Sequence, residues 1–299
     1  MKTTAALLFF IAILFVGCEY DNLDFNGELT DGFCIVANGK VVLNQSDIDY
    51  YDYSAHLIYM KENKSFADDI ESIGAFSVYA DRVQICKGQT VPGYSSFLPS
   101  GPIIMTHPSI YGSNIISIGF IQILDSLGNV LPDPREDERV VEALKKYNQF
   151  HAGLSCEIKS VQYLSSNSVK VDLTLKNNDP LNYYYLDPIK MSTNLFHYFT
   201  NGLSIRDFKN HKSYTHKTEV IQPVPWNSWK KEWLSLINQN ESKTITITYN
   251  NFEVVTPGRY KATFAYPGLS YQVEKKDLLQ DNGQIWLGNL NMIKEITIE

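Results

Sequence analysis

The stretch VKVDLTL, residues Val169–Leu175, alternates apolar and polar side chains without a break. A second such stretch, TITITY, covers residues Thr244–Tyr249. Successive side chains on a strand point to opposite faces of its sheet, so this period of two marks strands with one face on a core. The chain also carries 19 tyrosines and 15 phenylalanines, which suit half-buried sheet surfaces. The sequence therefore predicts a mainly β protein.

Turn signals divide the remainder of the chain into short segments, which is typical of β-sandwiches. We expect two β-sandwich domains, residues 31–132 and residues 154–299. In the first, strands are expected at Phe33–Leu43, His56–Lys61, Phe76–Tyr79, Val83–Lys87 and Ile115–Leu124. In the second, they are expected at Glu157–Tyr163, Ser168–Lys176, Phe196–Phe199, Thr244–Tyr249, Tyr260–Ala265 and Ile293–Ile298. The Pro-, Gly- and Ser-rich stretch Thr90–Pro108 predicts a long loop.

The stretch PGRYKATF, residues Pro257–Phe264, resembles the late strand of immunoglobulin-like sandwiches. In those folds a Pro-Gly turn leads into a strand whose first tyrosine packs back on the preceding loop. The resemblance covers about half of the C-terminal domain and implies that Tyr260 has this role. The chain lacks the Cys…Trp…Cys pattern of a true immunoglobulin domain.

One helix is expected between the two domains, within residues 133–153. Asp133 and Glu136 form a capping box around Pro134, which suits the first helical position. Apolar residues then recur at helical spacing, and we place the helix from Pro134 to Phe150 with Gly153 as its stop. It is either a rigid linker or a flap that closes the first domain.

The first 18 residues have the pattern of a secretory signal peptide. Lys2 supplies a positive charge, an unbroken apolar run covers Ala5–Val16, and Gly17-Cys18 follows. The end of this run, Phe15-Val16-Gly17-Cys18, resembles the lipobox of bacterial lipoproteins. The resemblance implies cleavage after residue 17, lipid attachment at Cys18, and anchoring to a bacterial outer membrane.

Residues 18–30 are expected to form an acidic tether behind the lipid. Acidic residues at this place also resemble the surface-export signals of some Gram-negative lipoproteins, and a plain solvated linker is the alternative. The net charge of −7 argues against a nucleic-acid partner. Cys34, Cys86 and Cys156 allow at most one internal disulfide, and no cofactor or metal motif is present.

Three tryptophans form the strongest candidate binding feature. Trp226, Trp229 and Trp233 are spaced three and then four apart, which would place them on one face of a helix. Such a face could stack on sugar rings or hold a protein partner. The alternative is that a short helix closes one end of the C-terminal sandwich and buries all three rings.

No catalytic constellation emerges from the sequence. We therefore expect an envelope lipoprotein with a non-enzymatic binding or structural role. One alternative is a glycan-binding accessory lipoprotein of a polysaccharide uptake system, which would use the tryptophans. The other is a hydrolase with Ser95 and His107 in the Thr90–Pro108 loop, although the second glycine of a nucleophile elbow is absent after Gly93.

Overall fold

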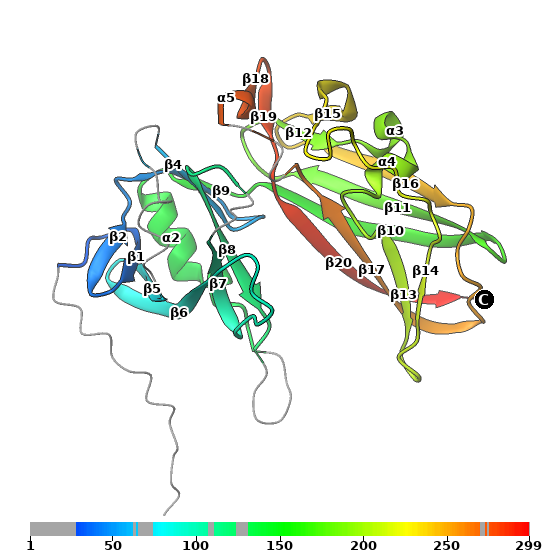
Figure 1. The fold of residues 1–299 in the computed structure, drawn as a ribbon, viewed down its shortest axis with the longest axis horizontal. Helices are drawn as coiled ribbons and strands as arrows, with labels where there is room; N and C mark the ends of the chain where they lie inside the picture. Colours follow the sequence, from blue (N-terminus) through cyan, green and yellow to red (C-terminus); the bar gives the residue numbers. More distant parts are fainter. Residues whose placement is uncertain are drawn as a thin grey trace, which may run out of the picture.

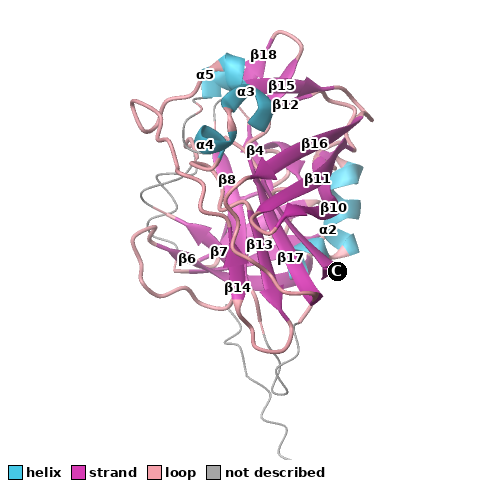
Figure 2. Ribbon diagram, turned by 90° about the vertical axis from the view of Figure 1, so that its right-hand side faces the viewer, coloured by secondary structure: helices cyan, strands magenta, loops and turns pink. Residues whose placement is uncertain are grey.

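The computed structural model describes residues 28–61, 64, 74–106, 111–123, 131–269, 273 and 275–298. The expected signal peptide, Cys18 and His107 lie outside these residues. The protein is mainly β, as predicted, and Figure 2 shows strands in both halves with few and short helices. Within the described ranges, no helix is long and apolar enough to cross a membrane.

The N-terminal half forms one sheet of nine strands in the order β2-β1-β5-β6-β7-β8-β4-β3-β9. The strands are β1 (Phe33–Ala37), β2 (Lys40–Leu43), β3 (Ile48–Asp52), β4 (Leu57–Met60), β5 (Ala75–Ala80), β6 (Val83–Val91), β7 (Gly101–Met105), β8 (Ile115–Ile121) and β9 (Phe150–His151). Asn38 and Gly39 join β1 to β2 with positive φ angles of 49° and 69°, as a two-residue hairpin requires.

A helix, and not a second separate sheet, packs against the core face of this half. Helix α2 (Glu138–Lys146) lies beside β1, β5 and β9 (Figure 1). Its buried residues Val140 and Leu144 join an apolar cluster with Phe33, Phe76 and other strand residues. The helix is therefore part of the N-terminal core.

The single helix expected from Pro134 to Phe150 is wrong at both ends. A 3₁₀ turn, η1 (Pro134–Glu136), ends at Asp137, whose extended backbone separates it from α2. The Asp137 side chain then caps α2 by accepting a hydrogen bond from the Arg139 amide. The helix ends at Lys146, and Phe150 and His151 then pair with β3 as β9. Asp133 and Asp137 each cap the start of a helical element, so they divide a segment whose apolar periodicity alone predicts one continuous helix.

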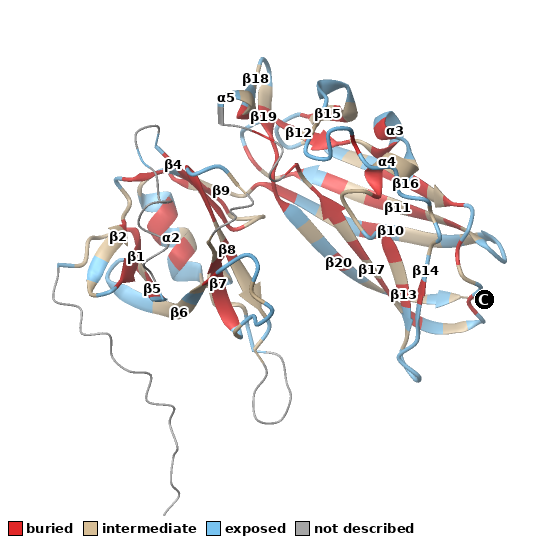
Figure 3. Ribbon diagram, viewed as in Figure 1, coloured by how far each residue is buried: buried red, intermediate tan, exposed pale blue. Residues whose placement is uncertain are grey.

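The C-terminal half contains three sheets, two of which enclose its core. The first has the order β10-β11-β16, and the second has the order β14-β13-β17-β20. Their strands are β10 (Leu154–Ser165), β11 (Ser168–Asn177), β16 (Ser242–Tyr249), β13 (Leu203–Asp207), β14 (Ser213–Thr215), β17 (Gly258–Pro267) and β20 (Asn289–Ile298). Apolar residues of both sheets form one buried cluster, and buried residues alternate with mostly half-buried ones along β11 and β17 (Figure 3). The alternation predicted for Val169–Leu175 and Thr244–Tyr249 is thus confirmed.

A third sheet, in the order β15-β12-β19-β18, lies at the end of this half that meets the N-terminal half (Figure 1). It consists of β12 (Tyr183–Leu186), β15 (Leu234–Ile237), β18 (Leu279–Gln280) and β19 (Gly283–Ile285). Short helices α3 (Pro188–Met191), α4 (Thr193–Phe196), α5 (Lys275–Leu278) and the 3₁₀ turn η2 (Lys231–Trp233) complete the half.

The tyrosine expected at the start of the late strand has the predicted contact. The Tyr260 hydroxyl donates to the carbonyl oxygen of Thr256 at 2.6 Å, in the loop that leads into β17. By contrast, the strand expected at Phe196–Phe199 is wrong. Phe196 ends α4 and is buried, and His197 caps that helix. Packing of Phe196 against the core outweighs the β propensity of this aromatic run.

Besides β9, two strands of the N-terminal half were not expected. β3 lies in a stretch rich in aspartate and tyrosine, and β7 lies inside the predicted Thr90–Pro108 loop. Most residues of both strands are buried on either face of the sheet. Such strands lack the alternation that identifies half-buried strands, so the pattern did not mark them.

Candidate functional site

The three tryptophans do not share a helical face. Trp226 lies in a turn that the Ser228 amide closes by donating to the Pro225 carbonyl at 2.8 Å. Only Trp233 belongs to a helical element, the short turn η2. Trp229 and Trp233 are half-buried and pack against the C-terminal core, with the Trp233 ring 6.2 Å from that of Phe199. The prolines at 223 and 225 lack amide donors, which explains why a regular helix does not form here.

Trp226 instead belongs to an exposed apolar segment, which we call the 220–226 segment. The exposed fractions are 53% for Val220, 52% for Ile221, 92% for Val224 and 53% for Trp226. Single exposed apolar residues are ordinary on protein surfaces, but four within seven residues form a candidate interaction site.

Hydrogen bonds to α4 and the residues after it hold this segment in place. The Ile221 amide donates to the Asn194 carbonyl at 3.1 Å, and the Asn194 side chain donates to the Glu219 carbonyl at 2.9 Å. The Tyr198 hydroxyl donates to the Trp226 carbonyl at 3.1 Å. The segment is thus fixed by its backbone while its apolar side chains face solvent. A surface that is already ordered loses little conformational entropy when a partner binds.

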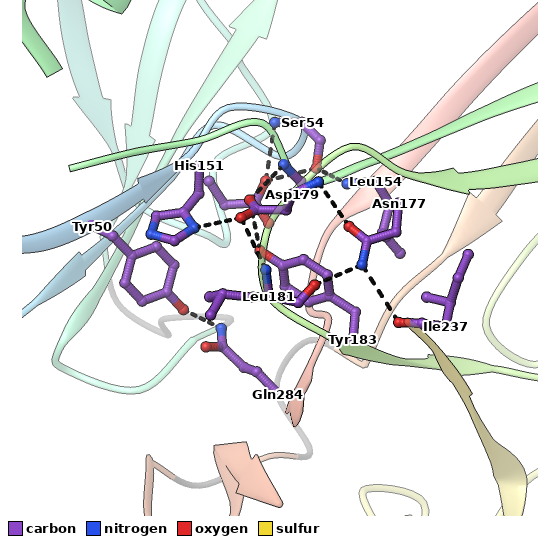
Figure 4. Close-up of polar contacts among 12 residues, drawn as sticks. Tyr50, Ser54, His151, Leu154, Asn177, Asp179, Leu181, Tyr183, Ile237 and Gln284 are labelled. Atoms are coloured by element: carbon purple, nitrogen blue, oxygen red, sulfur yellow. Dashed lines mark hydrogen bonds and ion pairs between the residues drawn. The ribbon is translucent and has the colours of Figure 1, made fainter. Parts of the chain in front are cut away.

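A second group of polar residues lies where the two halves meet, and we call it the junction network. Its members are Tyr50, Asp52, Ser54, His151, Asp179, Tyr183 and Gln284. They come from β3 and the turn that follows it, β9, the turn after β11, β12 and β19, and Figure 4 labels all of them except Asp52. Around them, Tyr50, Leu57, Tyr59 and Ile115 of the N-terminal half belong to the same buried cluster as the C-terminal core.

Asp179 accepts hydrogen bonds from members and neighbours of this network. Its carboxylate is fully buried and accepts from His151 Nδ1 at 2.8 Å, the Gly153 amide at 3.0 Å and the Tyr183 hydroxyl at 3.2 Å. Burial alone would raise the pKa of Asp179, but the bonds from His151 and Gly153 outweigh it and hold that pKa below its ordinary value.

Asp52 and Ser54 form a second part of this network. The Ser54 hydroxyl donates to Asp52 at 2.6 Å and accepts from the Leu154 amide at 3.2 Å and from Trp286 Nε1 at 3.4 Å. Burial raises the pKa of Asp52 to about 6, although hydrogen bonds from Ser54 oppose the shift. Gly153 is not the helix stop expected from the sequence. Its φ is +67°, and a side chain there would collide with Ser54 and Asp52.

The chemistry of the junction network suits structure better than catalysis. Its two carboxylates are buried and hydrogen-bonded, and its members come from both halves of the chain. Buried polar groups with satisfied hydrogen bonds fix one arrangement of the elements that carry them. The network therefore sets how the two halves join.

A third group combines one histidine with two carboxylates. One ring nitrogen of His56 and one oxygen each of Asp133 and Glu136 lie within 4.8 Å of one another. Burial lowers the pKa of His56 to about 3, so its imidazole is neutral at pH 7. The sequence predicts no metal site, because His56 lies far along the chain from Asp133 and Glu136 and no known motif joins them. Their donor atoms are nevertheless those that a divalent metal ion takes.

Ser95 has no catalytic partner among the described residues. Its hydroxyl donates to the Phe97 carbonyl at 2.7 Å and accepts from the Phe97 amide at 3.2 Å, so it closes its own turn. This arrangement gives the hydrolase alternative no support. Cys34, Cys86 and Cys156 are free thiols in the structure, and none of them forms the single disulfide that their number allowed.

Comparisons with known proteins identify no relative. No protein-family model matches the chain, and no curated protein matches it. Among solved structures, a selenomethionine-labelled β-glucosidase from Kluyveromyces marxianus is 10% identical, with a TM-score of 0.23 over 49% of this chain and 14% of that one. The same enzyme in complex with glucose is 11% identical, with a TM-score of 0.22 over the same shares. Likenesses this low carry no argument about fold or function.

Sequence reasoning thus found Trp226 but neither its surroundings nor the other two groups. The sequence pointed to Trp226 but not to the exposure of Val220, Ile221 and Val224. Their exposure depends on the hydrogen bonds that Asn194 and Tyr198 make to this segment. The positive φ of 51° at His56 is a backbone feature that sequence does not mark either.

Proposed function

We propose that the protein is a lipoprotein of the Gram-negative outer membrane, anchored through Cys18, which binds a protein partner through the 220–226 segment without catalysis. The anchoring part rests on the apolar run Ala5–Val16 and the lipobox-like sequence that ends at Cys18. Several acyl chains on one cysteine hold a protein at a membrane much more firmly than one chain does.

The binding part rests on one observation, the ordered and exposed apolar side chains of the 220–226 segment. Val220, Ile221 and Val224 are aliphatic, and the exposed indole of Trp226 follows them in the chain. Protein partners bury such mixed aliphatic and aromatic surfaces, and tryptophan is enriched among residues that dominate binding energy. The hydrogen bonds from Asn194 and Tyr198 hold this surface ready for a partner.

A glycan is the second candidate ligand, because the exposed Trp226 ring offers a flat face for a sugar. The other two tryptophans pack on the core and add nothing to such a platform. Retention on immobilised polysaccharides that is lost in Trp226→Ala, with no protein partner captured, would favour this candidate over the first.

We expect Trp226→Ala and Val224→Asp each to weaken partner binding about tenfold or more, the effect of removing about 1.4 kcal/mol of binding energy. The measurement is capture from solubilised envelope membranes on the immobilised protein, followed by titration of the captured partner. Both side chains are more than half exposed, so the variants keep the fold.

Leu164→Ala is the matched control, because Leu164 is also exposed and lies outside the 220–226 segment, near the C-terminal end of β10. It should leave capture unchanged. A partner that binds wild type, Val224→Asp and Leu164→Ala equally would exclude the 220–226 segment as the binding surface.

A further inference from the structure

His56, Asp133 and Glu136 come from two elements that lie side by side. His56 lies in the turn between β3 and β4, Asp133 caps η1, and Glu136 is the last residue of η1. One donor atom from each residue lies within 4.8 Å of the others. No hydrogen bond or ion pair joins the imidazole to either carboxylate in the described part of the chain. The three groups converge without bonding to one another.

The convergence is held by backbone contacts of the His56 turn and by Arg135, which hydrogen-bonds to the Asp133 carboxylate. The Ile118 amide donates to the His56 carbonyl at 3.1 Å, and Arg135 Nη1 donates to the Ile118 carbonyl at 2.6 Å. The same guanidinium binds both carboxylate oxygens of Asp133, with Nη2 2.5 Å from Oδ2. Strand β8 therefore ties the His56 turn to η1, and Arg135 fixes the orientation of the Asp133 carboxylate.

The orientation of the His56 ring is fixed from its buried side. The Tyr51 hydroxyl oxygen lies 3.0 Å from His56 Nδ1. The rings of Tyr51 and Tyr53 meet the imidazole edge-on, with ring centroids 6.1 Å and 5.4 Å from its own. His56 as a whole is only 9% exposed. With Nδ1 engaged, Nε2 is the nitrogen left for a ligand. A metal-binding histidine is usually held in this way by a hydrogen bond to its other nitrogen.

We propose that His56, Asp133 and Glu136 bind a divalent first-row transition-metal cation, for which Zn²⁺ is the probe of choice. Imidazole nitrogen suits Zn²⁺ and its neighbours, whereas Ca²⁺ and Mg²⁺ prefer sites built of oxygen alone. Zinc holds nitrogen and carboxylate oxygen at about 2.0–2.2 Å. Two ligand atoms of a tetrahedral ion are therefore about 3.4 Å apart. Rotation of the exposed Glu136 side chain can close the gap from the observed separation of within 4.8 Å.

Glu136 supplies most of the negative charge that is free to act on a bound cation. Asp133 is already paired with Arg135, which offsets its negative charge. Glu136 is exposed and supplies the negative charge that no such pair offsets in the described contacts of η1. Its removal leaves the imidazole and a carboxylate whose charge Arg135 already offsets, too little negative charge to hold a dication firmly.

The test titrates Zn²⁺ into the purified full chain in detergent, by calorimetry and by competition with a chromogenic zinc chelator. We expect one site per chain that also takes Mn²⁺ and does not take Ca²⁺. Glu136→Gln should lower the Zn²⁺ affinity at least tenfold, and His56→Asn should abolish the site. Asparagine is chosen because it tolerates the positive φ at position 56.

Glu138→Gln is the matched control, since Glu138 is exposed, lies two residues from Glu136 and is not one of the three converging residues. It should bind Zn²⁺ as the wild type does. Free thiols and other histidines can add background, so the result is the difference between variants. Equal affinity in wild type and Glu136→Gln would overturn the proposal, as would a wild type that binds no Zn²⁺ at 1 mM, about a thousandfold above a micromolar site. If His56→Asn does not fold, Glu136→Gln alone decides.

Discussion

Asp179→Ala should destabilise the folded protein by about 3–5 kcal/mol, the range seen when one partner of a buried ion pair is removed. The substitution leaves the His151 ring, the Gly153 amide and the Tyr183 hydroxyl without their acceptor in a region closed to water. Each buried donor that loses its partner costs free energy. The measurement is urea unfolding of the full chain at pH 7, followed by tryptophan fluorescence.

Asp281→Ala is the control for this experiment, because Asp281 makes only a surface contact with Lys231 at 3.4 Å. Exposed pairs contribute little, so its midpoint should barely move. If Asp179→Ala unfolds at the same urea concentration as Asp281→Ala, the junction network does not stabilise the union of the two halves.

Asp52→Asn should make the protein more stable at high pH and leave it unchanged at low pH. Folded Asp52 keeps its proton up to about pH 6, whereas the ordinary pKa of this group is 3.8. Between those values the folded state binds the extra proton, so stability falls as the pH rises through this window. The difference corresponds to about 3 kcal/mol at pH 8. Asparagine keeps an oxygen that can accept from Ser54 but carries no charge to bury.

The measured quantity is the difference in unfolding free energy between Asp52→Asn and wild type at pH 4 and at pH 8. Titration of the histidines is common to both proteins and cancels in this difference. Asp49→Asn is the control, since Asp49 is exposed on the same strand. A difference that does not grow from pH 4 to pH 8 would mean that burial does not raise the pKa of Asp52 in the folded state.

Strands β11 and β16 of the C-terminal sandwich could be predicted, because the alternation of buried residues within each strand is visible in its own sequence. In β11 and β16 every second residue is buried, so the sequence itself carries the period. Tyr260 could also be predicted, since its partner Thr256 is four residues away. Strands β3 and β7 could not, because burial on both faces removes the alternation.

The candidate sites could be predicted less well, because they depend on contacts between distant segments. Asp52, His151 and Asp179 meet only once β3, β9 and the turn after β11 are in place. The spacing of the tryptophans suggested a helix, but the turn after Pro225 and the packing of Trp229 and Trp233 decide which ring stays exposed. Tertiary contacts override a local period in such a case.

The most direct test of the proposed function is fatty-acid labelling at Cys18. Cells that express wild type, Cys18→Ala or Cys34→Ala grow with an alkyne fatty acid, and their membranes are then separated and the label is detected. Anchoring through Cys18 predicts that wild type and Cys34→Ala carry the label in the outer membrane, and that Cys18→Ala is unlabelled and absent from that fraction. A Cys18→Ala protein that is still labelled, or a wild type that never is, would contradict it.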